Sequence, residues 1–190
     1  MNDIMTVEVI PQPDASPAAP THNNWREFRK RNLILTCLPK GRYQNVLELA
    51  CSTGTLSSKL AERTHQLTCC DSSENALNAA MRRLGNRPHV RFMQRQVPKE
   101  WPEGQYDLIV INDLAKVLTP VELADTTIRI RDSLAPNGSV LACHWRSGGA
   151  SETEHQTADQ VHDVLNEHLG TRTLHHEEQD ILLDIWQGTA

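Results

Sequence analysis

One short stretch of the sequence carries the residue types of a ligand-binding turn. In "VLELACSTGTLS", residues 46–57, an apolar run leads into a turn of small residues. Turns whose backbone N–H groups approach a nucleotide place small residues, usually glycines, at alternate positions. The G-x-G-x-G places hold Ala50, Ser52 and Gly54, whereas the longer G-x-G-x-x-G spacing of dinucleotide sites ends on Thr55. The stretch therefore predicts a nucleoside-binding turn with unusual residues.

An acidic residue follows at a distance that suits a ribose. Asp71 comes directly after the apolar run "QLTCC", about 20 residues beyond the turn, as nucleoside sites in open α/β sheets require. A carboxylate at the carboxyl end of a strand can accept hydrogen bonds from both ribose hydroxyls. The alternative is helix capping, because "DSSE" opens a helix that Ser72 or Ser73 can cap with Glu74 nearby. We favour ribose binding, since capping alone does not require an acidic group at the end of a strand.

Strand and helix patterns alternate along the chain and position these residues. Short apolar runs predict strands at 45–50, 66–70, 89–94, 106–111 and 139–145, and amphipathic runs predict helices over 23–38, 55–63, 73–84, 119–134 and 157–168. This alternation is typical of βαβ units with right-handed crossovers, and hence of a mostly parallel sheet with helices on both faces. The run "YDLIVI" is almost continuously apolar, as expected for a central strand buried on both faces.

The end of the chain breaks this alternation. The strand-like runs "RTLHHEE" and "ILLDIWQ" are separated only by Gln179 and Asp180, with no helix between them. Two strands joined so closely can pair only as an antiparallel hairpin. The prediction is therefore an α/β sheet, mostly parallel, that ends in an antiparallel hairpin.

Composition limits the class of protein. With 190 residues, of which 38% are hydrophobic, the chain suits one globular domain, which we place at 23–190. It follows a proline-rich stretch, residues 1–22, that we predict to be a disordered arm. The net charge of -5 argues against nonspecific binding of nucleic acid.

Hydropathy, cysteine spacing and histidine spacing bear on the location of the protein and on metal binding. No apolar run approaches the ~18 residues that span a bilayer, so we expect no membrane partner. The N-terminus lacks a signal-peptide core and the five cysteines lack paired spacing, which favours a cytoplasmic protein with reduced thiols. The histidines at 155, 162 and 168, and the pair His175–His176, lack the spacing of a helical metal pair, so we expect no metal.

A resemblance extends these observations. The blocks "VLELACSTGTLSSKLAER", "CCDSSENALNAAMRRL", "HVRFMQRQVPKEWPEGQYDLIVINDLAKVL" and "LAPNGSVLACHWR" resemble, in order, those of class I S-adenosylmethionine-dependent methyltransferases. The chain is more narrowly similar to the nodulation protein S-type N-methyltransferases, over about residues 24 to 187. The resemblance implies a Rossmann-like seven-stranded sheet and S-adenosylmethionine as cofactor. It also implies methyl transfer to a small-molecule acceptor with an amine, such as an amino sugar.

The resemblance also assigns roles to residues of the cofactor site. Glu48 to Gly54 would form the loop beneath the methionine part of the cofactor, and Asp71 and Ser72 would bracket the ribose. Gln96, followed by Val97, would stand at the adenine, where relatives have an aspartate that accepts a hydrogen bond from the amino group. The alternative is that Gln96 is a loop residue before Pro98 with no role in binding. Ala50 departs from the glycine of relatives, and its methyl group would crowd the cofactor.

The segment after the fourth strand would lie at the acceptor. Asp113 keeps the acidic place of relatives, and Asn112, which we assign to the cofactor, adds a hydrogen-bond donor and acceptor. Lys116 and Val117 replace a pair of aromatic residues. A lysine there would repel the positive charges of the site or recruit an acidic substrate; alternatively, Lys116 is a solvated residue on a helical turn. The first helix, with Trp25 and Arg26, would help to cover the cofactor; alternatively, it is a helix anchored by one aromatic residue.

Methyl transfer to an amine requires that the amine loses a proton at some stage. Asp113 and His144 are the candidate catalytic residues, because each follows or ends a strand at the expected cofactor edge. The alternative for His144 is a partly buried residue that packs beside Trp145. The leading hypothesis is an active methyltransferase. The departures at Ala50, Gln96 and Lys116–Val117 support one competing interpretation, a catalytically degenerate relative that binds cofactor weakly or acts as a binding or regulatory module. The spacing of the turn and the final hairpin disfavour an NAD-linked oxidoreductase.

Overall fold

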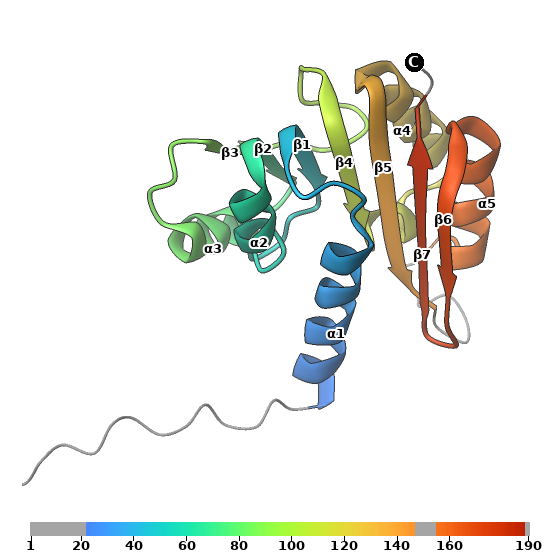
Figure 1. The fold of residues 1–190 in the computed structure, drawn as a ribbon, viewed down its shortest axis with the longest axis horizontal. Coiled ribbons are helices and arrows are strands. Elements are labelled where there is room, and N and C mark those ends of the chain that lie inside the picture. The colour runs from blue at the N-terminus through green and yellow to red at the C-terminus, as the bar shows by residue number, and fades with distance from the viewer. Residues whose placement is uncertain (1–21, 147–154, 189–190) are drawn as a thin grey trace, which may run out of the picture.

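Seven strands form one sheet in the order β3-β2-β1-β4-β5-β7-β6 (Figure 1). The computed structural model describes residues 22–146 and 155–188, so the predicted arm lies outside the described residues except for His22. The strands are β1 (Tyr43–Leu49), β2 (Thr64–Asp71), β3 (Val90–Gln94), β4 (Tyr106–Asn112), β5 (Leu134–Trp145), β6 (Thr171–Glu177) and β7 (Ile181–Gln187).

The direction of the strands matches the predicted topology. β1 pairs in parallel with β2 and β4, and the parallel part of the sheet continues to β3 on one side and β5 on the other. β7 runs antiparallel to both β5 and β6. The predicted mostly parallel sheet with a final hairpin is therefore confirmed. The strand order reverses between β1 and β4, and ligands of open α/β sheets bind at such a reversal.

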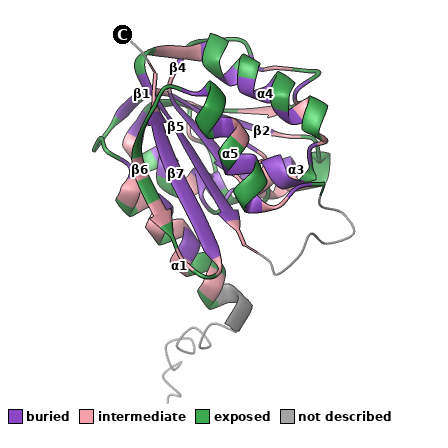
Figure 2. Cartoon of the chain, turned by 90° about the vertical axis from the view of Figure 1, so that its right-hand side faces the viewer, coloured by how far each residue is buried: buried purple, intermediate pink, exposed green. Residues whose placement is uncertain are grey.

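Helices cover both faces of the sheet, so alternate residues of the central strands enter two separate cores. In β4, Leu108 and Val110 pack toward α2 and α3, while Ile109 and Ile111 pack toward α4 and α5. Figure 2 shows β5 and β7 buried along most of their length. The helices are α1 (His22–Cys37), α2 (Ser57–Leu60), α3 (Glu74–Leu84), α4 (Pro120–Ser133) and α5 (Ala158–His168), with 3-10 turns η1 (Ala61–Arg63) and η2 (Leu114–Val117).

The helix ends follow local sequence signals. Capping boxes begin α4 at Thr119 and α5 at Thr157, and Ser73 caps α3 by accepting a hydrogen bond from the Ala76 N–H. The helix expected over 55–63 is shorter than predicted, because residues 52–56 are used by the turn and only α2 and η1 remain. None of the described helices is long and apolar enough to cross a membrane.

Helix α1 lies beyond the carboxyl ends of the central parallel strands (Figure 1). Its second half enters the core through Ile34, and Leu38, directly after its last residue, is buried there as well. Its first half is held mainly by charge: Arg26 pairs with Asp180 in the β6–β7 turn at 3.4 Å, and its guanidinium lies 4.4 Å from the centre of the Trp145 ring. Helix α1 is therefore fixed over the edge of the sheet where a ligand would bind.

Candidate functional site

Two adjoining pockets open at the carboxyl edge of the sheet, where the strand order reverses. The first pocket has a volume of about 640 Å³ and lies between α1 and the turn after β1; its lining residues are Glu27, Phe28, Arg31, Glu48, Ala50, Cys51, Ser52, Thr53, Thr55, Leu56, Asn112 and Asp113. The second pocket, of about 220 Å³, is lined by Ala50, Cys70, Asp71, Ser72, Arg95, Gln96, Val97, Leu114, Val117, Leu118 and Glu122. Because Ala50 lines both, the pockets form one elongated site.

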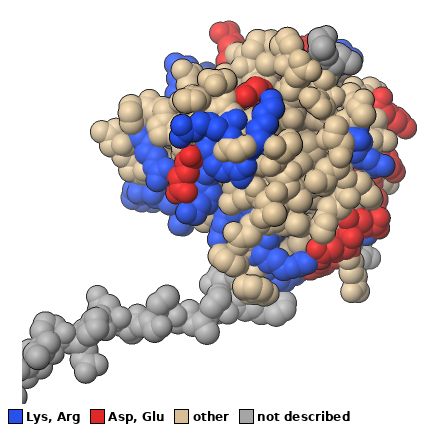
Figure 3. Space-filling view, viewed as in Figure 1, with Lys and Arg blue, Asp and Glu red and all other residues tan. Residues whose placement is uncertain are grey.

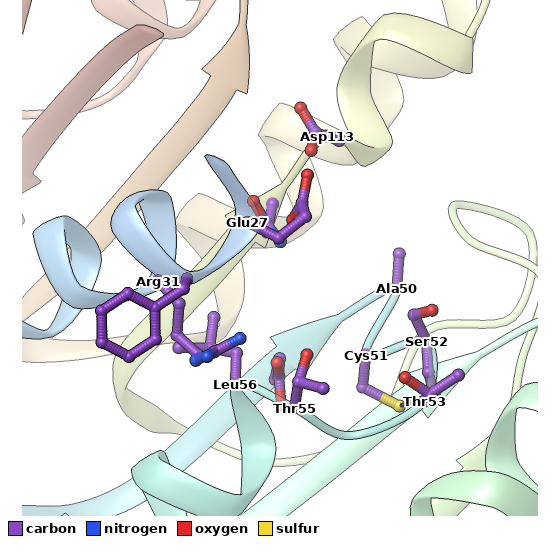
Figure 4. A pocket seen from close by; sticks show the side chains of 12 residues that line it. Glu27, Arg31, Ala50, Cys51, Ser52, Thr53, Thr55, Leu56 and Asp113 are labelled. Atoms are coloured by element: carbon purple, nitrogen blue, oxygen red, sulfur yellow. Dashed lines mark hydrogen bonds between the residues drawn. The ribbon is translucent and has the colours of Figure 1, made fainter. Parts of the chain in front are cut away.

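The turn after β1 explains why glycine is favoured at two of its positions. Ala50 has φ 53° and Ser52 has φ 51°, so both adopt the left-handed conformation. That conformation costs a residue with a Cβ atom roughly 1–2 kcal/mol, and glycine avoids the cost. Figure 4 shows Ala50 and Ser52 along the wall of the first pocket. The predicted departure at Ala50 therefore combines backbone strain with a methyl group between the two pockets.

We expect Ala50→Gly to tighten roughly tenfold the binding of S-adenosylhomocysteine, the demethylated form of the cofactor that the sequence resemblance implies, because it removes the alanine methyl group. Stability should change little, since relief of the left-handed strain is offset by the flexibility of glycine in the unfolded chain. Titration calorimetry and thermal unfolding measure the two effects. Ala124→Gly on the exposed side of α4 is the matched control and should cost about 1 kcal/mol of stability without changing affinity. Unchanged affinity in Ala50→Gly would show that the methyl group does not crowd the ligand.

Asp71 connects the turn to the start of α3. Its Oδ2 accepts a hydrogen bond from the Ser52 N–H at 2.8 Å, and its Oδ1 accepts one from the Ser73 N–H at 2.9 Å. Ser73, rather than Asp71, caps the helix. Each carboxylate oxygen keeps a second lone pair, and Asp71 lines the second pocket. The geometry thus leaves Asp71 able to accept further hydrogen bonds from a ligand.

The floor of the first pocket contains buried polar groups. Glu48 is only 2% exposed, and burial raises the pKa of its carboxyl group to about 8. The Cys69 thiol lies 3.9 Å from Glu48 Oε2. Asn112 Oδ1 is buried and has no hydrogen-bond partner among the described residues. An orphaned acceptor beside a buried carboxyl group suits a ligand that brings N–H donors or positive charge.

Asp113 is held from two sides. The residue is left-handed, with φ 58°; its Oδ1 accepts a hydrogen bond from the Trp145 N–H at 2.9 Å, and its Oδ2 forms an ion pair with the buried Lys30. Glu27 faces the same end of the first pocket from α1 (Figure 4). Its Oε1 accepts a hydrogen bond from Trp145 Nε1 at 2.8 Å. Two carboxylates therefore meet at this end of the site.

Of the remaining residues predicted to bind the cofactor, some line a pocket and one packs against a helix instead. Ser72, Gln96 and Val97 line the second pocket with Asp71. Gly54 lines neither pocket: it packs against α3, where an added Cβ would meet Ala80 Cβ and Leu84 Cδ1 at 2.9 Å. Gly54 therefore permits close approach of the turn to a helix, and its predicted contact with the ligand is not seen in the lining of the pockets.

His144 does not reach the site. It is fully buried on the face of β5 that packs against α5, and its Nδ1 lies 2.9 Å from Nε2 of His162. His162 Nδ1 is in turn 2.7 Å from Asp184 Oδ2. Burial lowers the pKa of His144 well below its ordinary value. The expectation of a catalytic residue at the cofactor edge is corrected here, because the side chains of β5 alternate and position 144 faces away from α1.

Lys116 and Val117 also differ from expectation. Lys116 is 4% exposed rather than solvated, and its Nζ donates a hydrogen bond to the Trp145 carbonyl at 2.9 Å. It lines neither pocket, so the structure does not place it beside an acceptor. Val117 lines the second pocket with Leu114 and Leu118. The segment after β4 thus gives an apolar wall to the second pocket and a buried lysine to the core.

Three site residues that we did not predict come from α1. Glu27, Phe28 and Arg31 line the first pocket, whereas Trp25 stacks on Phe28 with ring centres 5.6 Å apart. Their spacing of three and four residues marks one face of a helix, which is the signal that the sequence offered. No ion pair of Arg31 is seen among the described residues, although its guanidinium lies 5.6 Å from the centre of the Phe28 ring.

The fold and site define a nucleoside-binding α/β protein of the class I type, and comparison with known proteins identifies the family. A family model for a methyltransferase domain matches residues 46–138. The crystal structure of a Pseudomonas syringae protein, provisionally assigned as a methyltransferase, is 42% identical with a TM-score of 0.76; the match covers 86% of this chain and 99% of that chain. The chain belongs to the class I S-adenosylmethionine-dependent methyltransferases.

Two further relatives carry the nodulation name. Nodulation protein S of Rhizobium tropici is 27% identical over 149 residues, which are 77% of this chain and 63% of that protein. The N-methyltransferase NodS of Bradyrhizobium japonicum, solved in complex with S-adenosyl-L-homocysteine, has a TM-score of 0.79 at 22% identity; the match covers 90% of this chain and 94% of that one. The matched region spans less than two thirds of the length of the curated nodulation proteins. S-adenosylmethionine is the cofactor of the family, and the buried acceptors of the first pocket suit its positive charge.

Proposed function

We propose that this protein transfers a methyl group from S-adenosylmethionine to an amine nitrogen of a small-molecule acceptor. The observation that carries the proposal is the set of unengaged acceptors in the first pocket: Glu27 Oε2 has no hydrogen bond among the described residues, and Asn112 Oδ1 is an orphaned acceptor there. These acceptors favour a donor that carries positive charge, such as an ammonium group, over anionic groups. The name of the Bradyrhizobium relative, an N-methyltransferase, agrees with this preference.

In this proposal each pocket binds a different part of the cofactor. Asp71 would accept hydrogen bonds from the ribose, and the amide of Gln96 would face the adenine against the apolar Val97 and Leu118 in the second pocket. The methionine part would cross Ala50 into the first pocket. There Arg31 offers a guanidinium for its carboxylate, since arginine binds carboxylates through two parallel hydrogen bonds.

The chemistry then requires mainly alignment. S-adenosylmethionine supplies a methyl group that its sulfonium has already activated. The task of the protein is to hold the acceptor nitrogen in line with that methyl group, and alignment of this kind contributes up to ~7–11 kcal/mol. Helix α1 would exclude water from the methyl group, because its polar half is fixed over the first pocket by the Lys30–Asp113 and Arg26–Asp180 ion pairs.

The carboxylates at the acceptor end would have different roles. Both oxygens of Asp113 are already engaged, by Lys30 and by the Trp145 N–H. Glu27 accepts one hydrogen bond, from the Trp145 indole to Oε1, and its Oε2 has no hydrogen bond in the described part of the chain. We therefore assign to Glu27 the binding of the acceptor ammonium and the removal of its proton, and to Asp113 the positioning of α1.

The test is formation of S-adenosylhomocysteine when the protein is given S-adenosylmethionine and one acceptor of a matched pair. Each primary amine, such as glucosamine, is assayed beside its hydroxyl counterpart, such as glucose. We expect release with at least one amine and none with the alcohols, and Glu27→Gln should lower kcat about 100-fold while the Kd of S-adenosylhomocysteine stays unchanged. Glu167→Gln, an exposed change on α5, is the matched control. If the protein binds the cofactor tightly but forms no S-adenosylhomocysteine with any amine, the catalytically degenerate alternative is favoured.

A further inference from the structure

The basic residues of the chain are unevenly distributed. Residues 40–95 contain nine Lys or Arg and four Asp or Glu, which leaves ten basic and twenty acidic residues for the rest of the chain. Of the four acidic residues, Glu48 is buried and Asp71 lies in the site. Figure 3 shows Lys and Arg side chains gathered over the face that α2 and α3 form. A net charge of -5 therefore conceals a strongly basic face.

Hydrogen bonds place the members of this basic face around α2. Arg63 donates to the carbonyl of Lys40 at 2.6 Å, Arg87 donates to that of Ser58 at 3.4 Å, and Arg83 donates to that of Thr53 at 2.8 Å. Arg63 also donates to the carbonyl of Gly41 at 3.3 Å, so the exposed Arg42, next in the chain, lies close to it. We define the α2 patch as Lys40, Arg42, Lys59, Arg63, Arg83 and Arg87. Carbonyl partners orient a guanidinium but do not neutralise its charge. Lys59 with Glu62, at 3.3 Å, is the one ion pair seen in the patch among the described residues.

The α2 patch borders the candidate site. Arg83 holds the carbonyl of Thr53, and Thr53 lines the first pocket together with Thr55 and Leu56. Leu56 leads directly into α2, which carries Lys59. A macromolecule bound to the patch would therefore lie beside the turn that forms the floor of the first pocket.

We propose that the α2 patch is the docking surface for an acidic protein. Several uncompensated positive charges on one face attract a negatively charged partner and orient it before contact. A compact acidic domain can meet this face alone. An extended nucleic acid would run onto the remainder of the chain, where acidic residues outnumber basic ones two to one and would repel its phosphates.

Fluorescence anisotropy with a labelled, glutamate-rich helical peptide as the probe tests the proposal without requiring methyl transfer. We expect binding at low ionic strength that weakens steeply as salt is added, and no binding of a glutamine-rich peptide of equal length. Arg42→Glu with Lys59→Glu should weaken binding roughly tenfold; both side chains are exposed and neither lines the pockets. The affinity for S-adenosylhomocysteine should stay unchanged.

The matched control reverses two basic residues elsewhere. Arg129→Glu with Arg131→Glu on the exposed side of α4 makes the same change in net charge, and it should leave the peptide affinity within twofold. Equal weakening by both double variants would show a nonspecific charge effect and overturn the proposal. Failure of the peptide to bind, or tighter binding of a single-stranded DNA of equal charge, would also overturn it. Circular dichroism confirms that each variant is folded.

Discussion

Asp71→Asn is expected to weaken the binding of S-adenosylhomocysteine about 100-fold, because a carboxylate that accepts from two ribose hydroxyls contributes about 3 kcal/mol. The fold should survive. Asparagine keeps one oxygen that can accept from the Ser73 N–H, and the cap of α3 comes from Ser73 itself. Titration calorimetry of the two proteins measures the loss.

A second ligand distinguishes the contact of Asp71 with the ribose from its support of the turn after β1. Both roles are possible because Asp71 also accepts a hydrogen bond from the Ser52 N–H. The 2′-deoxy analogue of S-adenosylhomocysteine should bind the unchanged protein at least tenfold more weakly, and Asp71→Asn should show little of that difference. Glu74→Gln, in the first turn of α3, should leave both affinities unchanged. An equal loss from the missing hydroxyl in both proteins would mean that Asp71 supports the turn without touching the ribose.

The sheet was predictable because its signals are local and repeated. Most strands contain a short apolar run, although β6 is largely polar, and the continuous run of β4 matches its burial on both faces. The hairpin followed from the two residues that separate β6 from β7. Boundaries were less accurate where a strand is irregular: β5 begins at Leu134 rather than at residue 139, and its first part contains Asn137 with φ 56°.

Part of the site was predictable for the same reason. Ala50, Ser52 and Asp71 follow strands at the carboxyl edge, so their spacing along the chain indicates their place in space. The contribution of α1 was harder to foresee. Lys30 and Asp113 are more than eighty positions apart, and nothing in the sequence pairs one particular lysine with one particular aspartate. The ion pair depends on how α1 lies over the sheet.

The histidines show where sequence reasoning fails. His144, His162 and His175 come from β5, α5 and β6, and they share no spacing that predicts a cluster. In the structure they connect through Asp184: His175 Nδ1 lies 2.7 Å from its Oδ1, and His162 Nδ1 lies 2.7 Å from its Oδ2. Although burial acts to raise it, these hydrogen bonds lower the pKa of Asp184. The cluster therefore holds a buried carboxylate in its charged form.

Asp184→Asn should reduce the free energy of unfolding by about 3 kcal/mol. The substitution replaces a buried, charged carboxylate that contacts two histidine nitrogens with a neutral amide. Chemical denaturation at neutral pH measures the change. Asp159→Asn is the matched control: its ion pair with Arg146, at 2.7 Å, is exposed and should contribute less than about 1 kcal/mol.

The same variant tests whether the histidine cluster serves the site. His144, His162 and Asp184 line neither pocket, so folded Asp184→Asn protein should bind S-adenosylhomocysteine within twofold of the unchanged chain. The cluster would then stabilise the packing of α5 and β6 on β5 and β7, with no part in catalysis. A large loss of affinity at a temperature where the variant is fully folded would show that the cluster affects the site. His144 would then act through the backbone of Trp145, whose N–H donates to Asp113.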